Sequence, residues 1–354
     1  MEPKSQTSAT RKILFLFFLQ FFTVMCVFSY IRISKEPGIS ICLSEMTNNT
    51  TIEERAEPKV VILLWTWPFG ERFPLDKCDS LLGISGCYFT VNRTLYKKAD
   101  AVIFHYRDLR SSREELFQEP RFTFQRWVWF NMESPSNLGN LEPLNNLFNV
   151  TMSYRQDSDI FTPYGWLELL KEPENFTIPP KSKLVSWVIS NWNPNSRRVQ
   201  YYEELKKHVK VDLFGRVAQP LAKINKYSTI SQYKFYLAFE NSVHKDYITE
   251  KLWDNALLSG TVPIVLGPTR ENYERFLPSD AFIHVDDFPS AQELASYLKL
   301  LDSDDEQYQR YFKWRGRFQV KGDANWPEWY CKACQYLSQN PFYRITPSVA
   351  KWFA

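Results

Sequence analysis

Short apolar runs that are hydrophobic on both faces place the strongest limit on what this chain can fold into. They lie at residues 60–64, 101–104, 127–130, 184–189, 209–214, 235–239 and 262–266. Strands buried on both faces are typical of parallel sheets covered by helices. Amphipathic stretches at 196–208, 249–259, 271–276 and 291–301 predict such helices. We therefore expect an α/β protein with two Rossmann-like domains facing a cleft, at 58–172 and 181–325. A proline-rich stretch, 173–180, lies between them, and a segment at 326–354 follows them.

The N-terminus carries a run without charge, from Ile13 to Ile31. Nineteen residues are just enough to span a bilayer core. A cleaved signal peptide is the alternative, but the run exceeds a normal apolar signal region, and no clear small-residue cleavage site follows it. The pattern predicts a cytosolic tail at 1–12, a transmembrane signal anchor at 13–31, a polar stem at 32–57 and a lumenal C-terminal part.

Glycosylation sequons agree with a secretory route. The N-x-S/T pattern without an intervening proline occurs at Asn48, Asn49, Asn92, Asn149 and Asn175. The net charge of +3 is too small to indicate a nucleic-acid partner.

Four cysteines follow the predicted stem: Cys78, Cys87, Cys331 and Cys334. In an oxidising compartment they indicate two disulfides, with three connectivities open. A zinc or redox role for the Cys331-x-x-Cys334 pair is the alternative. The spacing between Cys78 and Cys87 does not form a usual zinc pair, so structural bridges are favoured.

The most specific stretch is YKFYLAFENSVHKDYITEKLWDNALLSGTVPIVLGP, residues 233–268. A predicted strand ends at Glu240 and Asn241, a polar loop follows, and Thr249 is placed to cap a helix whose first turn holds Glu250 and Lys251. A helix N-terminus that carries a lysine is suited to binding an anion. On spacing alone, a capped surface helix with a solvated charge cluster explains the pattern equally well.

This stretch resembles the donor-binding signature of the α1,3-fucosyltransferases. Further matching segments are WTWPFG (65–70), NMESP (131–135), YRQDSDIFTPYG (154–165) and SNWNPNSRRVQYY (190–202), and the resemblance covers about residues 60–353. The pattern is most similar to the brain-type, Lewis-x-forming branch. The resemblance implies a GT-B fold, GDP-fucose as donor and N-acetyllactosamine-type glycans of glycoproteins and glycolipids as acceptors. It assigns residues 58–172 to the acceptor side and residues 181–325 to GDP-fucose.

The family's inverting reaction needs a base for the acceptor hydroxyl and charges that stabilise the departing diphosphate. The resemblance gives the first role to Glu133 and the second to Arg198 and Lys251. An arginine grips phosphate oxygens through two N–H groups, whereas a lysine acts as a point charge. The remaining positions matched to the donor site are Tyr164, Val188, Ser190, Asn191, Tyr236, Asn241, Tyr247 and Glu250. His244 is a further acid/base candidate, although a lone histidine in a polar loop more often serves as a hydrogen-bonding residue.

Glu71 and Arg107 match acceptor-side positions. Glu71 replaces a glutamine of the brain-type branch, so the acceptor would meet a carboxylate there instead of an amide. An arginine at position 107 resembles members that prefer the α1,3 linkage, whereas a tryptophan accompanies α1,4 capability.

The resemblance also implies the disulfides Cys78–Cys331 and Cys87–Cys334, which would return residues 326–354 to the first domain. Relatives carry a third bridge, and its two positions are Ser186 and Tyr233 here. No essential metal or other cofactor is expected, and Asp157-Ser158-Asp159 is not read as a metal site.

Two other classes of protein compete with a fucosyltransferase. One is a catalytically silent, lectin-like type II membrane protein, and the other is a lumenal sulfotransferase, for which no phosphosulfate-binding strand-loop-helix is found. We predict an enzyme of the Golgi membrane, single-pass and type II, with its catalytic part in the lumen. Homodimerisation is the one protein–protein association expected.

Overall fold

The computed structural model describes residues 60–111, 120–216, 218–322 and 325–354. Contacts group the chain into units 1–55 and 56–354, and everything described here belongs to the second. The predicted tail, anchor and most of the stem, together with Asn48 and Asn49, lie outside the described residues. Within the described part, no helix has both the length and the apolar character needed to cross a membrane.

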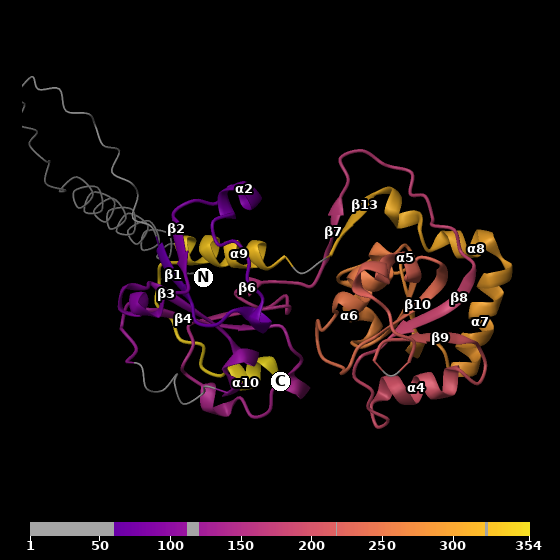
Figure 1. The fold of residues 1–354 in the computed structure, drawn as a ribbon, viewed down its shortest axis with the longest axis horizontal. Helices are drawn as coiled ribbons and strands as arrows, with labels where there is room; N and C mark the ends of the chain where they lie inside the picture. The colour runs from indigo at the N-terminus through magenta and orange to yellow at the C-terminus, as the bar shows by residue number, and fades with distance from the viewer. Residues whose placement is uncertain (1–59, 112–119, 217, 323–324) are drawn as a thin grey trace, which may run out of the picture. The chain divides into compact units, whose positions relative to one another are not determined.

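The first half of this unit is built on a six-stranded parallel sheet of order β2-β1-β3-β4-β5-β6 (Figure 1). Its strands are β1 Val60–Leu64, β2 Cys87–Thr90, β3 Ala101–His105, β4 Arg126–Asn131, β5 Val150–Ser153 and β6 Ile160–Phe161. Residues of β3 and β4 are buried on both faces, as their uninterrupted apolar sequence predicts. The connections carry α2 Cys78–Leu82 and the 3-10 turns η1 Pro68–Gly70, η2 Arg93–Lys98, η3 Tyr106–Ser111, η4 Pro135–Asn137 and η5 Glu142–Leu144.

The second half contains a five-stranded parallel sheet of order β12-β11-β10-β8-β9. Its strands are β8 Lys183–Val188, β9 Val211–Phe214, β10 Tyr233–Phe239, β11 Val262–Leu266 and β12 Ile283–His284. The helices are α4 Arg197–Leu205, α5 Lys226–Ile230, the π-helix η7 Lys251–Leu258, α6 Arg270–Glu274, α7 Ala291–Ser303 and α8 Asp305–Arg310. The 3-10 turns are η6 Lys223–Asn225, η8 Val285–Asp287 and η9 Lys313–Gly316.

Alternate residues of β10 enter two separate cores, one on each face of the second sheet. Phe235 and Leu237 pack with α4 and α7, whereas Tyr236 and Ala238 pack with α5, η7 and α6. This is the doubly wound arrangement expected from the sequence, and the α/β prediction is confirmed.

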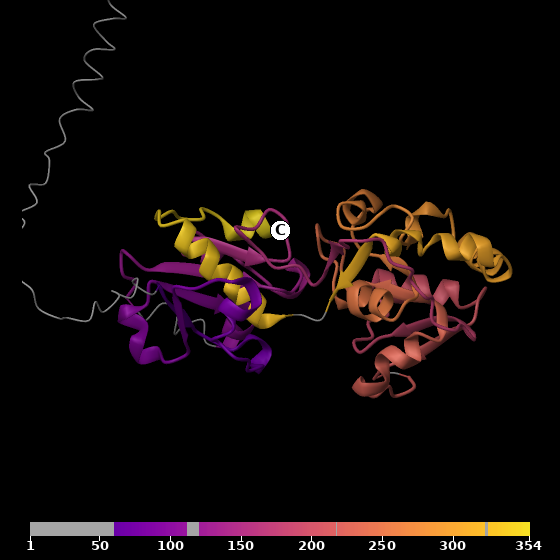
Figure 2. The ribbon, with the colours of Figure 1, turned by 90° about the horizontal axis from the view of Figure 1, so that it is seen from above.

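The C-terminal segment completes the core of the first half. Helix α9, Trp326–Gln339, lies along the first sheet, and α10, Val349–Phe353, buries Phe353 against Trp129 of β4 (Figure 2). The disulfides Cys78–Cys331 and Cys87–Cys334 tie α9 to α2 and β2. The predicted pairing is therefore confirmed. An antiparallel ribbon of β7, Trp166–Leu169, and β13, Phe318–Lys321, lies where the chain passes between the halves.

The positions expected to carry the relatives' third bridge are not opposite each other here. Tyr233 pairs with Lys183, and Ser186 pairs with Tyr236 three residues further along. Tyr233 is buried, and its hydroxyl donates to Asp212 Oδ2 at 2.8 Å. A packed and hydrogen-bonded tyrosine thus stabilises the start of β10.

Candidate active site

Glu133 follows the buried strand β4 and is held from two sides. Arg107 Nη1 donates to Glu133 Oε1, and Asn137 Nδ2 donates to Glu133 Oε2 at 3.2 Å. Asn131 Nδ2 fixes the backbone by donating to the Glu133 carbonyl at 2.6 Å. The Glu133 side chain is 19% exposed, so the carboxylate is oriented and still reachable.

The two predicted acceptor-side residues, Glu71 and Arg107, lie around an aromatic surface, and Arg107 also contacts Glu133. Arg107 stacks on the Phe69 ring at 4.6 Å, and Phe69 packs on Trp326 at 5.8 Å. Trp326 Nε1 donates to Glu71 Oε2 at 3.3 Å. Trp326 was not predicted as a site residue, because its place depends on the return of α9 to the first half.

Phe69 is held in a left-handed conformation, with φ 54°. Its N–H donates to Asp108 Oδ2 at 2.8 Å, and the same oxygen lies 2.6 Å from His105 Nδ1. Burial alone would raise the pKa of Asp108, but the hydrogen bond and charge of His105 hold that pKa below its ordinary value. The ionised carboxylate therefore fixes the loop that presents Phe69 and Glu71.

Arg198 and its neighbour Arg197 have opposite environments, which separates two residues that the sequence makes easy to confuse. Arg198 is buried in the first turn of α4, and its Nη2 donates to the Asn191 carbonyl at 2.6 Å. Its Nε has no hydrogen-bond partner. Arg197 is half-exposed and pairs with Asp286. Of these two neighbours, Arg198 is therefore the one with a buried guanidinium N–H that has no hydrogen-bond partner.

Lys251 lies at the start of η7 between two carboxylates. Its Nζ is 3.1 Å from Glu240 Oε2, 3.1 Å from Glu250 Oε1 and 2.8 Å from Thr249 Oγ1. Burial alone would lower the pKa of Lys251, but the charges of Glu240 and Glu250 raise it. Lys251 is therefore a fixed cation. Glu240, which was not predicted as a site residue, accepts from the N–H of Thr249 at 2.8 Å and holds the start of the helix.

Tyr247 is a buried tyrosine that feels the charges of both the predicted base and a predicted cation. The charges of Glu133, Glu240 and Lys251 all act on its phenol, and the pKa of Tyr247 is raised, chiefly by burial. The phenol in turn acts on Arg198. Glu133, Arg198 and Lys251 thus all interact electrostatically with one phenol.

The other predicted donor-site residues divide by exposure. Ser190 and Asn191 are exposed, and Val188 and Asn241 are half-buried. Tyr236 is fully buried, and its hydroxyl accepts from Asn255 Nδ2 at 3.0 Å. Tyr164 donates its hydroxyl to the Met132 carbonyl, next to Glu133. Tyr236 therefore packs in the core of the second half and does not present an open face to a sugar.

The predicted glycosylation site Asn149 has a buried side chain with partners at both ends of its amide. Asn149 is completely buried, its amide N–H donates to the Arg344 carbonyl, and its Oδ1 accepts from the N–H of Trp127 at 2.7 Å. The amide nitrogen that would carry a glycan is thus hydrogen-bonded within the protein. Asn92 and Asn175 are exposed, and both stay predicted glycosylation sites.

Asp157 and Asp159 are both used in ion pairs. Asp157 bonds to Arg155 and Lys245, and Asp159 pairs with Arg344. Across residues 60–111, 120–216, 218–322 and 325–354, no group of three His, Cys, Asp or Glu side chains could hold a metal ion.

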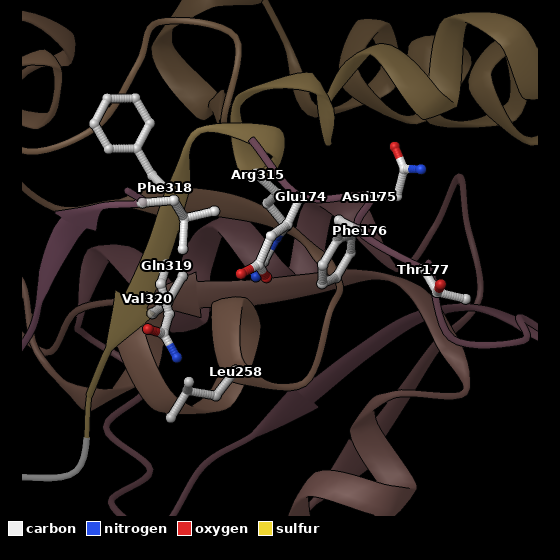
Figure 3. A pocket seen from close by; sticks show the side chains of 10 residues that line it. Glu174, Asn175, Phe176, Thr177, Leu258, Arg315, Phe318, Gln319 and Val320 are labelled. Carbon is white, nitrogen blue, oxygen red and sulfur yellow. The ribbon is translucent and has the colours of Figure 1, made fainter. Parts of the chain in front are cut away.

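A separate hollow of about 330 Å³ lies beside β13 and the end of η7 (Figure 3). Arg315, Phe176, Phe318 and Leu258 line it, together with the sequon residue Asn175. None of the residues predicted to bind donor or acceptor takes part in this lining, so we do not assign it to the active site.

Two parallel-sheet halves, with a carboxylate on one and buried cations on the other, are compatible with the nucleotide-sugar glycosyltransferase that the sequence predicts. Residues 57–165 match the family described as "Fucosyltransferase, N-terminal", and residues 178–352 match "Glycosyltransferase family 10 (fucosyltransferase) C-term". The chain belongs to this fucosyltransferase family and is an α-fucosyltransferase enzyme.

Named relatives match almost the whole chain. It is 48% identical over 340 residues to the 4-galactosyl-N-acetylglucosaminide 3-alpha-L-fucosyltransferase FUT6 of Pongo pygmaeus, covering 94% of each chain. It is 46% identical over 348 residues to the 3-galactosyl-N-acetylglucosaminide 4-alpha-L-fucosyltransferase FUT3 of Homo sapiens, covering 97% of this chain and 96% of that protein. The fold is similar to a crystal structure of an alpha1,3-fucosyltransferase with GDP-fucose. Its TM-score is 0.53 at 20% identity, covering 84% of this chain and 96% of that one.

Proposed function

We propose that this enzyme transfers L-fucose from GDP-β-L-fucose to the 3-hydroxyl of N-acetylglucosamine in N-acetyllactosamine-type glycans, with inversion. The product is an α1,3-fucosyl structure of the Lewis-x type, as in the brain-type branch. The observation that carries the proposal is that Glu133, Arg198 and Lys251 all interact electrostatically with the phenol of Tyr247. The relatives' names support the reaction class and the acceptor class.

In this reaction the acceptor O3 bonds to C1 of fucose while the bond from C1 to the diphosphate oxygen breaks. Glu133 accepts the proton of the O3 hydroxyl, and GDP leaves with the bonding electron pair. Arg198 and Lys251 stabilise the negative charge that develops on the diphosphate. Arg198 has a buried N–H without a partner, and Lys251 is kept cationic by two carboxylates, so both are suited to this task.

Arg107 supports the choice of the 3-hydroxyl. It holds Glu133 directly and stacks on Phe69, so the residue at this position borders both the base and the acceptor surface. Relatives named for either linkage match the chain at similar identity, and overall similarity therefore does not decide between them. The proposal predicts that Arg107→Trp increases use of acceptors whose 4-hydroxyl is free.

The sequence supports the cellular setting. The charge-free run at 13–31 and the sequons at Asn92 and Asn175 fit a single-pass type II protein of the Golgi membrane with a lumenal catalytic part. A homodimer in this membrane belongs to the same proposal. The silent lectin-like alternative is not favoured, because relatives that match almost the whole chain are named as fucosyltransferases.

A transfer assay tests the proposal directly. The purified protein is incubated with GDP-fucose and lactosamine acceptors of each galactose linkage, and the product linkage is determined. We expect an α1,3-fucoside on the 4-galactosylated acceptor, no transfer from other nucleotide sugars and retained activity in EDTA. An α1,4-fucoside as the main product, or transfer by Glu133→Gln at the unmodified rate, would contradict the proposal.

A further inference from the structure

The loop between β10 and η7, residues 242–247, makes a sharp turn with an unusual backbone conformation. Asp246 has a left-handed φ of 59° and is buried. Its carboxylate accepts from Asn272 Nδ2 at 2.6 Å and from the Gln156 N–H at 3.0 Å. Aspartate tolerates this conformation better than most residues, and the hydrogen bonds offset the strain. The turn therefore has one well-defined shape.

This loop belongs in sequence to the second half, but its side chains contact the first half. Lys245 Nζ lies 2.9 Å from Asp157 Oδ2. Tyr247 packs on Tyr154 at 5.1 Å and is part of the first half's core. Because the same loop leads directly into η7, it links the first half to the helix that carries Lys251.

One contact of the loop reaches the turn that carries the predicted base. His244 Nε2 lies 2.6 Å from Ser136 Oγ. Ser136 is in the short turn η4, Pro135–Asn137, and its neighbour Asn137 donates to Glu133 Oε2 at 3.2 Å. A continuous path therefore runs from the donor-side loop through Ser136 and η4 to the Glu133 carboxylate.

We infer that His244 is a positioning residue, which through Ser136 holds the Glu133 turn in register with the donor-binding loop. This inference rests on the proposed function and adds a role that the reaction itself does not require. In this role His244 does not touch the reacting atoms. Its Nε2, the ring nitrogen that faces η4, is hydrogen-bonded to Ser136 Oγ and acts on Glu133 only through η4. Misplacing a reacting group by about 1 Å lowers a rate up to about 100-fold, so a bond of this kind affects turnover without contributing to donor affinity.

The test uses His244→Ala, Ser136→Ala, the double variant and His244→Gln, whose amide N–H replaces Nε2. We expect kcat to fall about 10- to 100-fold in either alanine variant and no further in the double variant. Inhibition by GDP is expected to stay within about twofold. His244→Gln restores most of kcat with an unchanged pH profile. Ser136 is exposed, so Ser136→Ala tests the bond without disturbing a core. His208→Ala, in the turn that follows α4, is the matched control with unchanged kcat.

Three results would overturn the inference. Unchanged kcat in Ser136→Ala would show that the bond does not matter. A loss of GDP inhibition in proportion to kcat would make His244 a donor ligand. Failure of His244→Gln together with an altered pH profile would make it an acid or base. The proposed function is tested separately by fucose transfer from the unmodified protein and its loss in Glu133→Gln.

Discussion

The two disulfides offer a quantitative test of how the C-terminal segment is held, because their loops overlap almost completely. Cys78–Cys331 and Cys87–Cys334 join residues separated by 253 and 247 positions. While one bridge holds the two segments together, the other closes only a small loop of about 14 residues, made of 78–87 and 331–334. Breaking either bridge alone therefore releases only this small loop. Chain entropy gives about 3 kcal/mol for such a loop. Breaking the last bridge releases a loop of about 250 residues, for which the same relation gives about 5.5 kcal/mol.

Paired substitutions to alanine avoid leaving a free thiol. We expect Cys78→Ala/Cys331→Ala and Cys87→Ala/Cys334→Ala each to lower the free energy of unfolding by about 3 kcal/mol. The fourfold variant should lose about 8 to 9 kcal/mol, well beyond twice the loss of a pair.

Guanidinium unfolding followed by tryptophan fluorescence measures these free energies. Equal slopes of the unfolding free energy against denaturant concentration show that the variants unfold in the same transition. Lost packing of the buried sulfur atoms contributes similarly to both pairs, so the decisive quantity is the excess loss in the fourfold variant. Strictly additive losses, or a fourfold variant as stable as either pair, would refute the reasoning.

The remaining predictions concern the site and its surroundings. Glu133→Gln should lower kcat about 10²- to 10⁴-fold with little change in GDP inhibition, measured by steady-state kinetics, and equal losses of both would contradict a base. Arg198→Ala should weaken GDP binding about 10- to 100-fold in a competition assay, whereas Arg197→Ala, the matched control, should not. Hydrogen bonds from Arg155 and Lys245 lower the pKa of Asp157 to about 2. Because this pKa is lower in the folded than in the unfolded protein, ionised Asp157 stabilises the fold fully above about pH 4. The stabilisation is lost progressively as the pH falls from about 4 to about 2. The difference in Tm between the unmodified protein and Asp157→Asn should therefore be present at pH 7 and shrink toward pH 3. A difference that is independent of pH would show that the charge of Asp157 has no role.

The sequence by itself determined the elements and the class of site. Strands β1 and β11 have the predicted bounds, and β3, β4, β8 and β10 extend their predicted ranges by a few residues or shift by one. This worked because a strand buried on both faces leaves a local signal of consecutive apolar residues. The short strands β5, β6 and β12 gave too weak a signal of this kind. The motif at residues 233–268 was compatible with an anion site at a helix start, and the resemblance to the α1,3-fucosyltransferases favoured this reading over a solvated surface helix.

The tertiary structure decided everything that depends on residues far apart in the chain. It buried Asn149 beneath the Arg344 carbonyl, although its sequon looks like any other. It placed Trp326 beside Phe69. It also buried Tyr247 in the core of the first half. It also separated Arg198 from Arg197, which are equivalent as sequence but lie on different faces of α4. Periodicity records which side chains are apolar, whereas burial and partnership are fixed only when distant segments pack together, and that packing created this site.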